Sequence, residues 1–192
     1  MMSDFVANSD LEPELRSCHD EIKNINRAAE DLVRNLTEAQ LLWKPEPHVW
    51  SIAQCLDHMV ATARAELPAI RRTIAEGRSR QGFGHGLYHD GLLGWLLIKV
   101  MGERVRVKFK SPGVYLPSDD KAPADVIREF FLVQEEWLEC VREANGLDLA
   151  RTKVPIFYCK YTRLSLRQEF KLFVVHEQRH ILQAQRIKNA LR

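Results

Sequence analysis

The chain of 192 residues is 45% hydrophobic and 28% charged, and its 28 basic and 26 acidic residues give a formal net charge of +2. This balance excludes an electrostatic nucleic-acid binder, which needs a strongly basic surface. A chain of this length can bury roughly 70% of its unfolded surface in one core. We therefore expect a single domain over residues 1–192, with residues 1–9 as a flexible tail.

The four cysteines are scattered and include no C-x-x-C pair, a usage typical of a reducing compartment. The first residues have neither the basic segment nor the apolar segment of a secretory signal. The longest apolar stretch, residues 91–102, is too short to span a bilayer. These features predict a cytoplasmic protein that is not stably inserted in a membrane.

An apolar stripe with helical spacing runs from Leu11 to Leu36 and predicts the first long helix. A capping-box pattern at Thr37 then opens a short helical piece. A second capping box, at Ser51, starts a long helix that can run to Gly77, because glycine is favoured just after a helix end.

The third long helix is predicted to begin near Pro123 and to end before Asn145. A capping box at Ser165 starts the fourth, which runs nearly to Arg192. The connection over residues 78–122, about 45 residues, is far longer than antiparallel neighbours need. It can cross the whole bundle, so the second and third long helices can be parallel. The sequence thus predicts an all-α four-helix bundle with up-down-down-up topology.

The connection itself has no assigned role. Its apolar part, residues 91–102, is expected to form a helix that covers a bundle face or a partner subunit rather than a membrane surface. Residues 104–110 alternate basic and apolar side chains and fit a short ribbon or an extended loop. His85 and His89 are four residues apart, but the surrounding glycines argue against a helix there.

Two histidines interrupt the apolar stripe of the fourth helix. His176 and His180 are four residues apart, which on a helix means ~6 Å of rise and ~40° of rotation, so they share a face. Buried imidazoles need partners, either a divalent metal or backbone and water groups. His58 on the second long helix can supply a third ligand if the two helices pack together. Three histidines plus an exchangeable water is the open arrangement of catalytic zinc.

Residues 176–180 also match the H-E-x-x-H string of zinc peptidases. The extended motif needs glycine and histidine where Gln183 and Arg186 stand, and no acidic residue follows Glu177 as a further ligand. A peptidase with Glu177 as its base is therefore a remote alternative. Gln183, one turn beyond His180, is a candidate for holding a metal-bound water or orienting a ligand. The alternative is that Gln183 is only a polar residue at the edge of the apolar stripe.

Two further residues lie near this site in the sequence. Trp50 is expected to pack the end of the bundle rather than to bind substrate, although it directly precedes the helix of His58. Cys55, three residues before His58, can face the metal, but we favour a buried and inert thiol.

The segments "WSIAQCLDHMV" and "HEQRHILQAQRI" resemble the W-S-I-x-x-x-L-x-H and H-x-x-x-H-[LI]-x-Q motifs of the DinB-like superfamily, which includes the YfiT-like hydrolases. The resemblance covers roughly residues 10–192. It implies an up-down-down-up bundle, often dimeric, with a zinc or nickel ion held by His58, His176 and His180 and completed by water.

The resemblance further implies a metal-dependent enzyme that acts on a small molecule. Its reaction would be a hydrolysis or an S-transfer with a low-molecular-weight thiol, and its assembly a homodimer. A non-catalytic bundle that binds a metal or a ligand is the alternative from another class.

Overall fold

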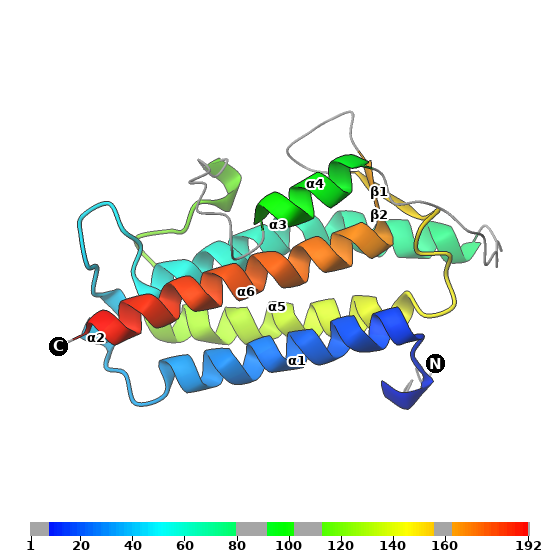
Figure 1. Cartoon of the computed structure of the whole chain (residues 1–192). Helices are drawn as coiled ribbons and strands as arrows, with labels where there is room; N and C mark the ends of the chain where they lie inside the picture. Colours follow the sequence, from blue (N-terminus) through cyan, green and yellow to red (C-terminus); the bar gives the residue numbers. More distant parts are fainter. Residues whose placement is uncertain (1–7, 80–91, 102–112, 156–162, 192) are drawn as a thin grey trace.

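The structure is a computed structural model that describes residues 8–79, 92–101, 113–155 and 163–191 (Figure 1). Four long helices make up most of this part. In chain order, its helices and strands are η1 (Asn8–Asp10), α1 (Pro13–Val33), α2 (Glu38–Leu42), α3 (Ile52–Ser79), α4 (Leu92–Met101), η2 (Gly113–Tyr115), α5 (Pro123–Glu143), β1 (Lys153–Pro155), β2 (Arg163–Ser165) and α6 (Leu166–Ala190).

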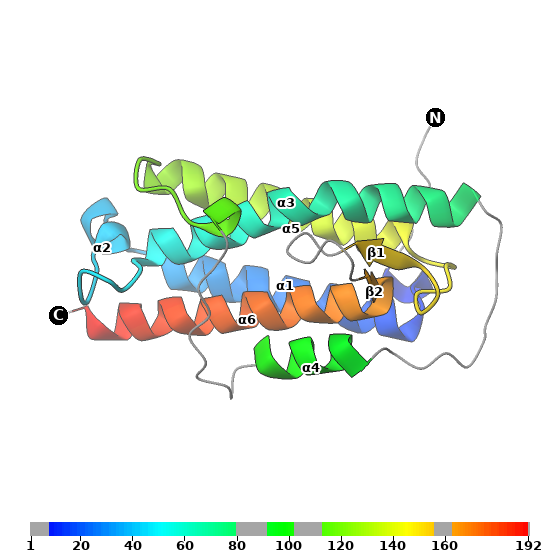
Figure 2. The ribbon, with the colours of Figure 1, turned by 90° about the horizontal axis from the view of Figure 1, so that it is seen from above.

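The long helices α1, α3, α5 and α6 form a four-helix bundle. The chain colours in Figures 1 and 2 show α1 and α6 running in one direction and α3 and α5 in the other. Helix α3 packs against α5 and α6, and α1 packs against the same two helices. Helices α3 and α5 are therefore parallel neighbours joined by the long connection, which confirms the predicted all-α, up-down-down-up bundle.

Capping boxes fix the starts of the two helices that matter most for the site. Ser51 Oγ accepts the Gln54 amide at 3.1 Å, and Gln54 Oε1 accepts the Ser51 amide at 3.0 Å. Ser165 and Gln168 exchange the same pair of bonds at 3.1 and 3.2 Å. Each box satisfies two amides that the first turn of a helix leaves unbonded, so the register of α3 and α6 is set locally.

The centre of the bundle is filled by aromatic side chains from diagonal helices. Trp137 of α5 stacks on Phe173 of α6 with ring centroids 3.8 Å apart and planes 17° apart. Phe170, one turn earlier on α6, meets the same indole edge-on. Since these rings are almost completely buried, they hold α5 and α6 together across the core.

Helix α4 covers the outer face of α6, which confirms the expectation that this apolar segment covers a bundle face. Leu97, Ile98 and Met101 pack against Leu164 and Leu172. Figure 2 shows α4 running alongside α6. Among the described helices, none combines the length and apolarity that crossing a membrane would require.

A short antiparallel ribbon, which was not predicted from the sequence, precedes α6. Val154 of β1 pairs with Leu164 of β2, and β2 ends at the cap residue Ser165. Strands of three residues are too short to show alternation in a sequence. The predicted ribbon at 104–110 and the pair His85 and His89 lie outside the described residues. So do residues 1–7 of the expected tail, whereas its last residues begin η1.

Candidate metal centre

Three histidines from α3 and α6 meet inside the bundle. His58 lies two turns after the Ser51 cap, and His176 and His180 lie on one face of α6. One nitrogen from each ring falls within 4.8 Å of the other two. Nε2 of His58 and Nε2 of His176 are 3.1 Å apart. The structure therefore brings together all three residues that the sequence singled out.

The spacing of these nitrogens fits a divalent ion. Tetrahedral zinc with Zn–N bonds of about 2.0–2.1 Å separates two imidazole nitrogens by roughly 3.4 Å. The 3.1 Å between the Nε2 atoms of His58 and His176 is close to that value. All three rings are buried, with exposed fractions of 3%, 7% and 8% for His58, His176 and His180. Converging lone pairs of buried rings repel unless a cation or a proton lies between them.

Hydrogen bonds at the second ring nitrogens leave Nε2 as the free nitrogen of two rings. His58 Nδ1 lies 2.6 Å from the carbonyl oxygen of Tyr115, to which a protonated Nδ1 donates. His180 Nδ1 lies 3.2 Å from Oε1 of Gln183. A proton on Nδ1 leaves the Nε2 lone pair unprotonated, which is the tautomer that a metal ion needs. Gln183 thus contacts a candidate ligand, and its role in orienting that ligand stays a prediction.

The electrostatics keep the rings neutral. Burial, followed by the neighbouring His176, lowers the pKa of His58 to about 4. Burial, followed by the charge of Arg179, lowers the pKa of His176 to about 4 as well. Burial and the two other histidines hold the pKa of His180 well below its usual range. Neutral imidazole is the form that binds metals, so near pH 7 no proton has to be removed before an ion binds.

Glu177 lies on the Nδ1 side of the His176 ring. Its Oε1 is 3.7 Å from His176 Nδ1, and its Oε2 accepts a hydrogen bond of 2.7 Å from Nε2 of Gln134 on α5. Burial raises the pKa of Glu177 to about 8, against the opposing effect of the Gln134 bond. Glu177 is thus placed behind a candidate ligand and not on the side where Nε2 meets His58.

Three groups near the candidate metal centre were not predicted from the sequence to belong to it: the Trp50 ring, the Tyr115 carbonyl and the Gln134 amide. The Trp50 ring lies 4.8 Å from the His58 ring and 5.9 Å from the His180 ring, centroid to centroid, and so forms a wall of the site. Its position directly before α3 was the available signal. The Tyr115 carbonyl and the Gln134 amide carry no sequence signal, because the long connection and α5 bring them in from elsewhere.

Cys55 stays outside the cluster of metal-ligating groups found among the described residues. It is completely buried, and burial raises the pKa of its thiol to about 12. Because the thiolate is the form that binds metals, this agrees with the predicted inert core thiol.

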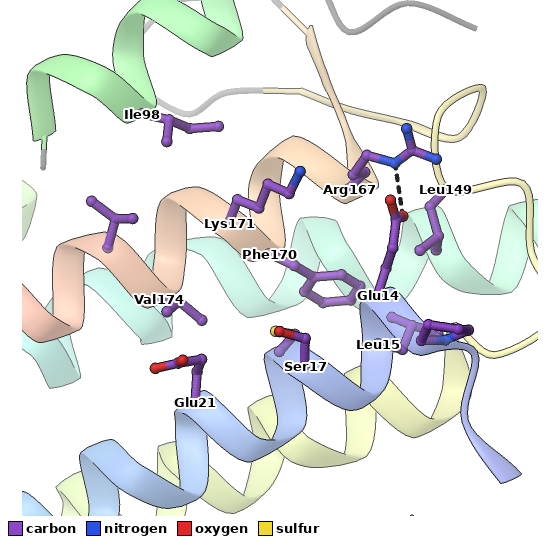
Figure 3. A pocket seen from close by; sticks show the side chains of 13 residues that line it. Glu14, Leu15, Ser17, Glu21, Ile98, Leu149, Arg167, Phe170, Lys171 and Val174 are labelled. Carbon is purple, nitrogen blue, oxygen red and sulfur yellow. Dashed lines mark ion pairs between the residues drawn. The ribbon is translucent and has the colours of Figure 1, made fainter. Parts of the chain in front are cut away.

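A groove of about 460 Å³ lies on another side of α6, between α1, α6 and α4 (Figure 3). Cys18, Phe170 and Val174 help to line it, and an ion pair of 2.9 Å between Arg167 and Glu14 lies at its edge. None of the three histidines lines this groove. It is therefore separate from the candidate metal centre, and the described residues that line it form no cluster of metal-ligating groups like the three histidines.

Comparison with known proteins connects this geometry to a family. No curated protein matches the sequence. Among solved structures, YfiT from Bacillus subtilis, described as a probable metal-dependent hydrolase with an unusual four-helix bundle topology, matches with a TM-score of 0.57 and 11% identity. The match covers 98% of this chain and 91% of YfiT, and it concerns the fold. The sequence profile of the DinB superfamily matches residues 22–184, which include all three histidines, and the chain belongs to this superfamily.

Proposed function

We propose that the protein is a divalent-metal-dependent hydrolase of small molecules, with the ion held by Nε2 of His58, His176 and His180. The observation that carries this proposal is the convergence of three buried, neutral imidazoles from two helices, with two Nε2 atoms 3.1 Å apart. Membership in the DinB superfamily and the fold of YfiT, itself described as a probable metal-dependent hydrolase, support it.

Each residue around the ion has a defined task in this proposal. His58, His176 and His180 would hold the ion with coordination positions left open, and the ion would supply a Lewis acid that activates water. Tyr115 and Gln183 fix the rings of His58 and His180 through Nδ1. Trp50 offers an aromatic wall to the substrate. Imidazole ligands suit both zinc and nickel, so we propose one of these two ions.

Transfer of a low-molecular-weight thiol is a second candidate, and one observation favours it. Hydrolysis gains from a base beside the attacking water, yet Glu177 lies on the Nδ1 side of His176. A thiol needs no separate base once a metal ion has lowered its pKa. The same position of Glu177 speaks against an H-E-x-x-H peptidase, in which that glutamate serves the water on the metal.

The metal can be tested by elemental analysis of purified protein and of two variants. His176→Ala removes a central ligand and should lose the ion, whereas the native chain should hold about one ion per chain. His19→Ala is the matched control, because His19 is also buried but lies on α1 outside the cluster. Equal metal content in the native protein and His176→Ala would contradict the proposal.

The reaction can be tested by screening esters, amides and electrophiles with and without added thiols. Turnover that needs only water and disappears in His58→Ala supports the hydrolase. Turnover that appears only with a thiol supports the transferase. A protein that binds the ion but turns over none of these compounds would favour a non-catalytic binding bundle.

A further inference from the structure

Asp57, the residue before His58, ties the end of the long connection to α3. Its side chain is almost completely buried. Oδ2 accepts the backbone amide of Ser118 at 2.6 Å, and Oδ1 accepts the Lys121 ammonium at 2.9 Å. Consecutive helical residues point about 100° apart, so Asp57 reaches this segment while His58 faces α6. The Asp57 carboxylate therefore does not lie among the three candidate metal ligands.

The segment that Asp57 holds also carries the hydrogen-bond acceptor of His58. Tyr115, whose carbonyl oxygen is 2.6 Å from His58 Nδ1, is only three residues before Ser118. Pro117 between them has a fixed φ and restricts the conformation of Leu116. The turn on the other side is closed by a bond of 3.2 Å from the Leu116 amide to the Gly113 carbonyl. The carbonyl and the Ser118 amide thus belong to one stiff piece of backbone.

Lys121 adds an ion pair to the hydrogen bond between Asp57 and Ser118. Its ammonium bridges Asp57 and Glu129, with a distance of 3.0 Å to Oε2 of Glu129. Burial acts to lower the pKa of Lys121, but its bonds to the two carboxylates outweigh that effect and raise it. Gln54 adds a bond of 2.6 Å to Asp119. Asp57 is the most buried acceptor of these contacts and the one that bonds the backbone itself.

We propose that Asp57 is a positioning residue for the metal centre: by holding Ser118 and Lys121, it keeps the Tyr115 carbonyl against His58 and so presents the Nε2 lone pair of His58 to the ion. This inference rests on the proposed metal-dependent function. In this proposal, residues 115–121 of the long connection select the tautomer of His58, although none of them binds the ion.

The physical reason lies in the two tautomers of a neutral histidine. With the carbonyl in place, the proton stays on Nδ1 and Nε2 can bind the ion. When the carbonyl moves away, the proton can also occupy Nε2, and that tautomer must convert before an ion can bind. Loss of such an outer partner lowers metal affinity by about 10–100-fold.

The first experiment compares zinc affinity, measured with a competing chelator, in the native protein and three variants. Asp57→Ala should bind zinc about 10–100-fold more weakly. Asp57→Asn can still accept the Ser118 amide through its amide oxygen. Its zinc affinity should therefore lie between those of the native protein and Asp57→Ala. Asp148→Ala is the control, because Asp148 also accepts backbone amides, those of Ala150 and Arg151, in the connection that follows α5, and should bind zinc like the native protein. Native affinity in Asp57→Ala would overturn the proposal.

The second experiment reads the tautomer directly by nitrogen NMR of the imidazole rings in metal-free protein. His58 should carry its proton on Nδ1 in the native protein and in Asp148→Ala, and should show a mixture in Asp57→Ala and Asp57→Asn. A purely structural role would leave the His58 signals unchanged in the folded Asp57→Asn, and that outcome overturns the proposal. If native protein bound neither zinc nor nickel, the proposed function would fail, while this measurement would still decide the role of Asp57.

Discussion

The three histidines differ in what holds their second ring nitrogen. A backbone carbonyl holds His58, the side chain of Gln183 holds His180, and His176 Nδ1 has no hydrogen-bond partner among the described residues. Glu177 Oε1, at 3.7 Å, lies just beyond hydrogen-bond range of that nitrogen. Bound metal would favour a proton on His176 Nδ1 and so a closer contact with Glu177.

Gln183 gives a test at the scale of one residue. Gln183→Ala removes the acceptor of His180 Nδ1 and should weaken zinc binding about tenfold, because the ring then has no fixed tautomer. Gln185→Ala, a change of the same kind two residues on that removes no observed hydrogen bond, should leave the affinity unchanged. Equal affinities in the two variants, measured by chelator competition, would remove Gln183 from the site.

Helical spacing was enough to find the three histidines. A separation of four residues places His176 and His180 on one face whatever the rest of the chain does, and the cap at Ser51 fixes where His58 points. The partners of these rings could not be found in that way. The Tyr115 carbonyl is a backbone group at the end of a long connection, and Gln134 reaches Glu177 across the core.

At the scale of elements, local chemistry decided the boundaries of the long helices. Ser51 and Ser165 start α3 and α6 where the capping boxes predicted, and Pro123 opens α5. The sequence predicts the C-terminal ends of the helices less accurately than their starts. Helix α3 runs to Ser79, two residues beyond the predicted end at Gly77. Helix α4 was expected from its apolarity, but only the structure shows that it packs on α6.

The contact between α4 and α6 depends on a glycine. A Cβ at Gly94 would lie 2.2 Å from Nε2 of Gln168, whose side chain cannot move freely because it completes the Ser165 cap. Gly94→Ala should therefore destabilise the packing of α4 by about 1–3 kcal/mol, although alanine is the better helix former. Amide hydrogen exchange should show faster exchange in α4 while the long helices remain protected.

Gly113→Ala is the matched control for this prediction. A Cβ at Gly113 would meet nothing within 4 Å, so exchange in α4 should stay at the native rate. Unchanged exchange of α4 in Gly94→Ala would mean that α4 does not pack as closely as described.

At the scale of the whole molecule, the bundle buries two sets of titratable groups that respond oppositely to pH. Burial raises the pKa of Glu169 to about 7 and that of Glu177 to about 8, and burial with these carboxyls raises the pKa of Glu66 well above its usual value. The histidines of the centre have lowered pKa values, about 4 for His58 and His176.

The signs follow from proton binding in the two states. Between about pH 4 and 6.5 the unfolded chain binds more protons at the histidines, so their burial lowers stability as the pH falls. Between about pH 4.5 and 8 the folded chain binds more protons at the carboxyls, so stability falls as the pH rises. Above about pH 6.5 only the carboxyl effect remains.

Metal-free protein should accordingly be less stable at pH 8 than at pH 7, where the histidine effect is largely absent, as measured by urea unfolding in the presence of a chelator. Glu169→Gln should reduce this loss, because the amide has no proton to release, whereas the exposed Glu143→Gln should keep it in full. An equal free energy of unfolding at the two pH values would contradict the assignment of these carboxyls as protonated in the folded state.

Anomalous X-ray scattering from crystals of zinc-loaded protein tests the central claim most directly. We expect one strong peak between α3 and α6, with Nε2 of His58, His176 and His180 each about 2.0–2.1 Å away. A peak at some other place, or three well-ordered histidine rings with no peak between them, would contradict it.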